Sequence, residues 1–420
     1  MSAFFRSVLL LTLIAGVHGM VSAEDGERPS EEPLGVPDEA AIASGIDEAL
    51  AYLLKHQELY EPDPAVGSIP DAELASWQEQ ERERLREQRV ESGPGSEWPY
   101  EGVYRVGADW RIPAGYRVGG TAIACLALLG APGWEGAPER HAAVARGTQF
   151  MLERIEADPD MAPGPKQGYD VRGWGHVYAM SFLLRALDLQ ILTDPATRKQ
   201  AEETIPHLVY CIAENEEPGG GWNYAGRGTS PFMTGATLLA LFHANARGYE
   251  VDGAMVERAL DALEGGRTGI GSFAYSGTVA GEVAMPGSSA RAAIAELCLF
   301  RAGRSSEARL RAAVHGFFEG WDDLFDRKSK QGTHEGPYNI APYYFYFGHT
   351  YAAIAIEHLS EGSRAAEREQ LLALLWRTRE ADGSWNDRVF PRTGSYATAM
   401  GILALVAPAL PAVEAWTERN

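Results

Sequence analysis

Two histidines occupy matching positions in two similar segments of the chain. His176 follows Gly175 in "WGHVYAMSFLLRAL", and His349 follows Gly348 in "FGHTYAAIAIEHL". Imidazole is the side chain that changes its charge closest to neutral pH, so a pair of imidazoles suits general acid and base chemistry. If the two segments lie opposite each other in the fold, the two imidazoles are expected to face one another at the mouth of a cavity.

The loops before these histidines add carboxylates and aromatic rings. "GYDVRGWGH" contains Asp170, and "THEGPYNIAPYYFYFGH" contains Glu335. A concave site can shift the pKa of such groups toward neutrality, so we predict His176, His349, Asp170 and Glu335 as candidate catalytic residues. Aromatic rings mixed with polar groups also suit ligands with apolar faces, sugars among them. The predicted ligand-binding residues are Trp174, Arg172, Trp222, Tyr224, Arg227, Tyr338, Tyr344 and Tyr346.

Six similar segments position these residues. Each begins at a glycine or small-residue turn and continues as a helix rich in Ala, Leu and Thr, as in "VGGTAIACLALLG" and "TGSYATAMGILAL". Their glycines recur about every 55 residues, which indicates a repeat architecture. The glycines are Gly119, Gly175, Gly235, Gly287, Gly348 and Gly394.

Helices with a charged stripe alternate with these apolar segments. The first ends near Gln57, and five more follow, among them "AMVERALDALEG" and "AAEREQLLALLWRTRE". A helix that is apolar nearly all round belongs in an interior, whereas a helix with one charged stripe belongs outside. The alternation therefore predicts an all-α fold, an (α/α)6 toroid of six inner and six outer helices.

Four loops that lead from an outer to an inner helix share a motif. They read "GSEWPY", "GGGWNY", "GSFAY" and "DGSWND". Glycine lets the chain leave a helix with positive φ, and the aromatic residue after it can wedge between neighbouring helix pairs. We interpret these aromatic residues first of all as structural staples.

The ends of the chain and one insertion are predicted to lie outside the repeats. Residues 1–23 have the charged, apolar and small-residue order of a signal peptide cleaved near Ala23, which predicts an exported, periplasmic or extracellular protein. Residues 24–37 form an acidic, proline-rich leader that is expected to be disordered. The toroid spans 38–412 with a charged helical insertion at 58–116, and 413–420 form a C-terminal tail.

Composition excludes several classes of partner. The formal charge of −21 opposes binding to nucleic acid and to anionic membrane surfaces. No segment after the signal peptide is apolar over the roughly 20 residues that a membrane-spanning helix needs. Three widely spaced cysteines, Cys125, Cys211 and Cys298, predict buried apolar side chains rather than a disulfide framework. We predict no cofactor.

The repeats resemble those of the terpenoid cyclase and protein prenyltransferase superfamily, including the squalene and hopene cyclases. "LLALLWRTREADGSW" is similar to their repeat motif, and the likeness extends over about residues 38 to 410. The resemblance implies an α/α toroid. The chain lacks the DxDD motif that carries the acid of the triterpene cyclases.

The prenyltransferase branch implies a zinc site held by Asp, Cys and His. Glu296 and Cys298 mimic the Asp-x-Cys pair, and "FGHTYAAIA" is similar to the segment that carries the histidine, here His349. Counted from their repeat glycines, these residues are displaced by roughly 12 to 15 Å along parallel helices. Zinc ligands must meet at one point, so we predict no metal site.

Three functions stay open from the sequence. The first is a toroid that binds a ligand at an aromatic cavity rim, either a glycan, an apolar molecule or a protein. The second is an exported glycan-active lyase or hydrolase, and the third is an isoprenoid cyclase or a prenyltransferase-like enzyme. The residues fix no reaction, so the sequence leaves open whether the chain is an enzyme.

Overall fold

The chain folds as alternating helices, without strands in the part that the structure describes. The structure is a computed structural model. It describes residues 35–60, 80, 83, 95–101, 111–164, 170–224, 228–277, 283, 285–330, 334–388 and 390–418. The predicted signal peptide and almost all of the leader lie outside these ranges, as does most of the 58–116 insertion, so the domain boundaries stay predictions.

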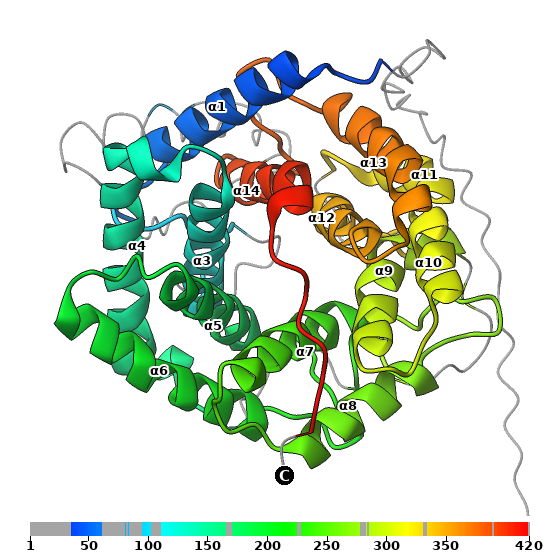
Figure 1. Ribbon diagram of the computed structural model, residues 1–420, viewed down its shortest axis with the longest axis horizontal. Coiled ribbons are helices and arrows are strands. Elements are labelled where there is room, and N and C mark those ends of the chain that lie inside the picture. Colours follow the sequence, from blue (N-terminus) through cyan, green and yellow to red (C-terminus); the bar gives the residue numbers. More distant parts are fainter. Residues whose placement is uncertain are drawn as a thin grey trace, which may run out of the picture. The chain divides into compact units, whose positions relative to one another are not determined.

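Six helices form the inner ring, one from each predicted apolar segment. Each packs against the next, and the last packs against the first, so the ring is closed (Figure 1). Most residues of these helices are buried on every side, as the composition predicts. In chain order they are α3 (Ala114–Gly130), α5 (Arg172–Asp188), α7 (Pro231–Ala246), α9 (Met285–Arg301), α12 (Tyr344–Ile356) and α14 (Thr393–Val406).

The six predicted charged segments form the outer ring around them. They are α1 (Glu39–Lys55), α4 (Pro138–Ala157), α6 (Pro195–Glu214), α8 (Gly253–Gly265), α10 (Glu307–Glu319) and α13 (Glu361–Trp376). Each buries only a stripe. In α8 the buried residues are Met255, Val256, Ala259, Leu260 and Leu263, which recur at helical spacing on one face. The predicted (α/α)6 toroid is confirmed.

Two details differ from the prediction. Helix α3 begins at Ala114 rather than near Val118, and α12 begins at Tyr344 rather than Phe347, which brings further tyrosines into the first turns of the inner ring. The last part of the fifth charged segment forms a separate short helix, α11 (Trp321–Arg327). The break falls at Gly320, where a Cβ atom would lie 2.7 Å from Cβ of Ser289, so the outer chain approaches α9 closely.

The loop aromatics are structural staples, as predicted. The backbone N–H of Trp222 donates to Oγ1 of Thr234 at 2.8 Å, and its indole N–H donates to the carbonyl of Ile212 at 2.8 Å. The staple therefore ties the end of an outer helix to the start of the next inner helix. Trp98 bonds in the same way to Thr121 and Leu53, Trp385 to Thr398 and Leu375, and the backbone N–H of Phe273 to Ser288.

The last described residues cover one end of the inner ring. Residues 411–418 run across the C-terminal ends of the inner helices (Figure 1). The backbone N–H of Trp416 donates to the carbonyl of Arg301 at 3.1 Å, and Asn245 Nδ2 donates to the carbonyl of Thr417 at 2.9 Å. The staple loops lie at the other end, where the inner helices begin. None of the described helices combines the length and apolar character that crossing a membrane requires.

Candidate functional site

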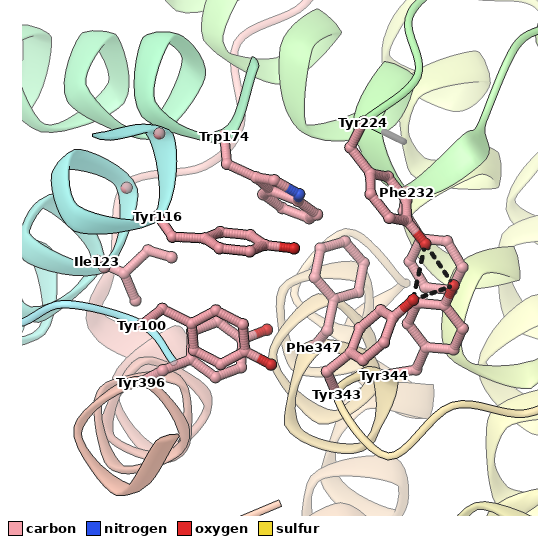
Figure 2. A pocket seen from close by; sticks show the side chains of 13 residues that line it. Tyr100, Tyr116, Ile123, Trp174, Tyr224, Phe232, Tyr343, Tyr344, Phe347 and Tyr396 are labelled. Carbon is pink, nitrogen blue, oxygen red and sulfur yellow. Dashed lines mark hydrogen bonds between the residues drawn. The ribbon is translucent and has the colours of Figure 1, made fainter. Parts of the chain in front are cut away.

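A cavity lined by aromatic rings lies where the inner helices begin (Figure 2). Its empty space, including the open mouth, is about 470 Å³, but the centre of a water-sized sphere could move through only about 40 Å³ of it. The cavity is therefore a narrow slot between flat side chains. Its lining residues are Tyr100, Gly115, Tyr116, Gly119, Gly120, Ile123, Trp174, Tyr224, Phe232, Tyr343, Tyr344, Phe347 and Tyr396.

The walls of the slot are held by contacts between rings. Trp174 lies with its ring centroid 6.0 Å from that of Phe347, and Phe232 stacks on Tyr344 at 3.8 Å. Among the lining residues that the structure describes, none carries a carboxylate, ammonium or guanidinium group. The polar groups on the cavity wall are backbone atoms, the indole N–H and the tyrosine hydroxyls, so the surface offered to a ligand is apolar with few hydrogen-bonding positions.

One wall carries a network of phenol hydroxyls (Figure 2). The hydroxyl of Tyr224 lies 2.6 Å from that of Tyr344 and 3.0 Å from that of Tyr343, and it also bonds to the hydroxyl of Tyr275. Burial raises the pKa of Tyr224 and Tyr344 well above the ordinary value for tyrosine. These phenols are therefore neutral hydrogen-bonding groups at physiological pH.

An imidazole and a guanidinium lie behind this wall. His334 Nε2 lies 2.8 Å from the hydroxyl of Tyr344, and burial together with the charge of Arg291 lowers the pKa of His334. Arg291 donates through Nε to the carbonyl of Phe273 at 3.0 Å, and burial lowers its pKa to about 10. The imidazole is therefore neutral near pH 7 and connects the phenol network to a less buried position.

A buried carboxyl that the sequence did not predict lies behind the opposite wall, near two lining tyrosines but not itself among the lining residues. Asp387 is fully buried, neither of its side-chain oxygens has a hydrogen-bond partner in the described part of the chain, and burial raises its pKa to about 7. Its charge interacts with Tyr100 and Tyr396, which line the cavity.

The position of Asp387 in its repeat is the sequence signal that could have located it. Tyr100, Tyr224, Tyr275 and Asp387 each follow a staple aromatic by two residues. Tyr100 and Tyr224 line the cavity, and Tyr275 bonds to its phenol network. The loops "GSEWPY", "GGGWNY", "GSFAY" and "DGSWND" thus share one repeat position near the cavity, occupied three times by tyrosine and once by aspartate.

His349 does not face the cavity. Its ring is fully buried, and Nε2 accepts a hydrogen bond of 2.9 Å from the indole N–H of Trp321 in α11. Nδ1 donates to the carbonyl of Phe345 at 2.8 Å, one turn earlier in α12. Both ring nitrogens are thus used in the wall between the inner and outer rings.

His176 is directed the same way. Its ring is fully buried, and Nε2 lies 2.9 Å from the carbonyl of Met161 in η4 (Pro159–Met161), the short helix after α4. The expectation that His176 and His349 face each other is wrong. It assumed that the residue after each repeat glycine points to the axis, whereas this register places it toward the outer ring.

The two predicted carboxylates lie away from the cavity in ion pairs. Asp170 accepts from Arg172 at 2.7 Å, and Arg172 is buried and also donates to the carbonyl of Gly164 at 2.6 Å. Glu335 accepts from Arg327 at 2.7 Å, and its side chain is 55% exposed. These contacts give Asp170, Arg172 and Glu335 positions in loop packing rather than on the cavity wall.

The predicted ligand-binding residues divide into two groups. Trp174, Tyr224 and Tyr344 line the cavity. Trp222 is a staple, and Tyr346 is buried with its hydroxyl donating to the carbonyl of Thr378 at 3.3 Å. Tyr338 lies on an exposed loop, and Arg227 is outside the described residues.

The residues that mimic a zinc set are held apart by separate partners. Glu296 accepts from Arg267 at 2.8 Å, whereas the thiol of Cys298 lies 3.4 Å from the carbonyl of Gly235. His349 bonds to Trp321 and Phe345 as described. Within the described ranges, no group of three or more His, Cys, Asp or Glu side chains is arranged to hold a metal ion.

Comparison with known proteins finds likeness in fold. No protein-family model and no curated protein sequence matches the chain. Among solved structures, the glucoamylase of Hormoconis resinae matches with a TM-score of 0.50 at 11% identity, covering 89% of this chain and 75% of that one.

Two further structures match with lower scores. A type II terpene cyclase from Scytonema has a TM-score of 0.46 at 15% identity and covers 89% of this chain and 100% of that one. A family 76 glycoside hydrolase from a bovine Bacteroides thetaiotaomicron strain has a TM-score of 0.47 at 10% identity, covering 87% and 78%. By its closed inner ring and the outer ring around it, the chain is an α/α toroid.

Proposed function

We propose that this toroid binds a small, mainly apolar molecule in the tyrosine-lined cavity. The observation that carries the proposal is the composition of the cavity wall, which is aromatic and has no charged side chain among its described lining residues. Cavities that bind small ligands are mostly apolar and have a few polar groups that fix the orientation of the ligand. Here the tyrosine hydroxyls supply those polar groups.

The narrowness of the slot selects for shape. Trp174, Tyr344 and Phe347 present ring faces and edges to a cavity with little free volume. A flat ring system or a slender chain needs the least displacement of these rings, and aromatic pairs gain roughly 0.5 to 1.5 kcal/mol beyond the burial of their area. A ligand made of flat or unbranched hydrocarbon is therefore favoured.

The arrangement gives less support to an exported glycan-active enzyme. Glycoside hydrolysis uses a pair of carboxyl groups that flank the bond to be cleaved. Asp170 and Glu335, the two carboxylates predicted for that role, lie in ion pairs away from the cavity. An isoprenoid alcohol or hydrocarbon, in contrast, belongs to the class of ligand that the cavity wall favours. Binding of such a ligand is compatible with an isoprenoid cyclase or a prenyltransferase-like enzyme.

The proposal includes export. Residues 1–23 have the pattern of a signal peptide, and the described part of the chain has no helix that could anchor it in a membrane. Expression of the full chain in a bacterial host, followed by mass analysis of the product outside the cytoplasm, tests it. We expect a mature chain that begins after Ala23.

Calorimetric titration with 2-methylnaphthalene tests the binding function. We expect saturable binding at one site, and a ligand concentration of about 100 times Kd should add roughly 2.7 kcal/mol to the free energy of unfolding. Trp174→Ala removes one wall and should weaken binding about tenfold or more. A parallel titration with a maltooligosaccharide tests the alternative, that the protein binds a glycan.

Trp416→Ala is the matched control. Trp416 belongs to residues 411–418 and packs on Phe242 at the other end of the inner ring, with ring centroids 5.6 Å apart. This variant should lose some stability and keep the affinity of the parent protein. If the oligosaccharide binds and 2-methylnaphthalene does not, the ligand is a glycan and the proposal of an apolar ligand is wrong.

A further inference from the structure

Two buried polar groups at one side of the cavity have no hydrogen-bond partner among the described residues. The hydroxyl of Tyr100 is one, and this residue lines the cavity with only 8% of its surface exposed. The carboxyl of Asp387 is the other, with both oxygens unpaired and no exposed surface. A buried polar group without a partner costs roughly 1 to 3 kcal/mol of stability, so two in one place need an explanation.

The geometry of the repeats brings these groups together. Tyr100 follows the staple Trp98 by two residues, and Asp387 follows the staple Trp385 by two residues, so both occupy the same position in their repeats. Figure 2 shows Tyr100 beside Tyr396, with their hydroxyls directed toward the middle of the cavity. The charge of Asp387 acts on both of these phenols.

The two groups are complementary. The Tyr100 hydroxyl can donate one hydrogen bond, and an ionised Asp387 can only accept. A single alcohol group both accepts and donates, so one ligand hydroxyl would satisfy both. A carbonyl or an ether would satisfy Tyr100 alone, and an ammonium would satisfy Asp387 alone.

Neighbouring charges favour a neutral ligand group over a cation. The groups that act on Asp387 are Arg388 and Lys328, both cationic. The other titratable groups near it are the phenols of Tyr100, Tyr346 and Tyr396. A ligand ammonium would be repelled by the two cations, whereas a hydroxyl would not.

We propose that the ligand of this cavity carries an alcohol or phenol hydroxyl, which accepts a hydrogen bond from Tyr100 and donates one to Asp387. The inference rests on the proposed binding function and names its ligand class: an apolar molecule with one hydroxyl at the end that meets Tyr100. The phenol network on the opposite wall contacts the remainder of the ligand.

Three matched probes test the inference: 2-naphthalenemethanol, its methyl ether and 2-methylnaphthalene. They share one ring system and differ in whether they donate and accept, only accept, or do neither. We expect the alcohol to bind about tenfold more tightly than the hydrocarbon, with the ether between them. Equal affinity for all three would overturn the hydroxyl inference and leave the binding function standing, whereas no binding of any probe would overturn the binding function itself.

Tyr100→Phe separates a binding role from a structural one. Loss of an unpaired buried hydroxyl should leave the melting temperature unchanged or raise it, because no hydrogen bond is broken. The same variant should lower the affinity for the alcohol about fivefold to tenfold more than it lowers the affinity for 2-methylnaphthalene.

Tyr346→Phe is the control, since its hydroxyl bonds to Thr378 away from the cavity. It should lower stability without changing the affinity for any probe. A Tyr100→Phe variant that binds the alcohol as tightly as the parent would refute the assignment.

Asp387→Asn tests the second half of the site. In the parent protein the affinity for the alcohol should rise as pH increases through about 7, because the ionised carboxylate is the stronger acceptor. The ether does not donate, so its affinity should not follow pH in this way. In Asp387→Asn the rise should disappear, and a rise that persists in the variant would remove Asp387 from the site.

Discussion

The indole nitrogen of Trp321 donates a hydrogen bond of 2.9 Å to Nε2 of His349, and both side chains are buried. Because Nε2 accepts, the ring proton is on Nδ1, which donates to the carbonyl of Phe345 at 2.8 Å. His349 is thus a neutral imidazole that joins α11 to α12. The pair makes this connection in a repeat whose loop carries none of the four staple aromatics.

Replacing His349 by Leu should therefore lower stability without affecting the cavity. The change leaves the Trp321 N–H buried and unpaired, which costs about 1 to 3 kcal/mol in the free energy of unfolding. Urea denaturation measures this loss. The affinity for 2-methylnaphthalene should be unchanged, and a loss of affinity with unchanged stability would return His349 to the site.

Acid should destabilise the protein through two fully buried histidines of the inner ring, His176 and His349. Burial lowers the pKa of His176 and of His349 to about 4. As pH falls from about 6.5 toward 4, these imidazoles take up protons in the unfolded chain but stay neutral in the folded one, so stability is lost in that window. The loss approaches roughly 3 kcal/mol per histidine.

The slope of stability against pH checks this prediction. In His349→Gln, the free energy of unfolding should fall less between about pH 6.5 and 4.5 than in the parent protein. His141→Gln, at an exposed position, is the control and should keep the parent slope. Parallel slopes in the His349 variant and the parent would contradict the buried neutral imidazole.

Asp387 should have the opposite effect on stability to the histidines: it destabilises the protein as pH rises. Its pKa is raised to about 7 by burial, from the ordinary value of 3.8. As pH rises from about 4 to 7, the unfolded chain loses this proton while the folded chain keeps it, so stability falls with rising pH and then levels off.

Asp387→Asn should remove that loss. Relative to the parent protein, the variant should gain up to roughly 4 kcal/mol between about pH 4 and pH 8, read as the difference between the two unfolding curves. An unchanged difference across this range would mean that the carboxyl is ionised in the folded state at low pH.

The staples should contribute to stability through their backbone bonds. Thr234→Val keeps the shape of the side chain but leaves the backbone N–H of Trp222 without its acceptor, which lies at 2.8 Å in the parent. We expect a loss of about 1 to 3 kcal/mol. Thr237→Val is the matched control, because the Thr237 hydroxyl donates only to a carbonyl of its own helix and its loss should cost less.

The repeat pattern in the sequence determines the fold but not the direction of individual side chains. Alternating apolar and charged helices predict two rings, and all twelve helices are present. Position after a repeat glycine does not predict which way a side chain points, since His176 and His349 face the outer ring while Trp174 and Phe347, two residues before each, line the cavity. A shift of two residues on a helix turns a side chain by about 200°, which explains the wrong assignment.

The cavity itself combines residues that no single segment reveals. Tyr100, Tyr116 and Tyr396 come from a loop and two helices that are far apart in sequence, and they meet only when the ring closes between α14 and α3. The residues next to Asp387 in the sequence form no recognisable catalytic or binding motif. Its significance depends on burial and on missing partners, which are properties of the folded chain.

A crystal structure of the protein with 2-naphthalenemethanol would show directly whether the cavity holds a hydroxylated ligand. We predict the ring system against the lining rings of Trp174 and Phe347, with its hydroxyl within hydrogen-bond distance of Tyr100 and Asp387. A cavity that stays empty at ligand concentrations well above Kd, or a ligand bound only on the outer surface, would contradict the account.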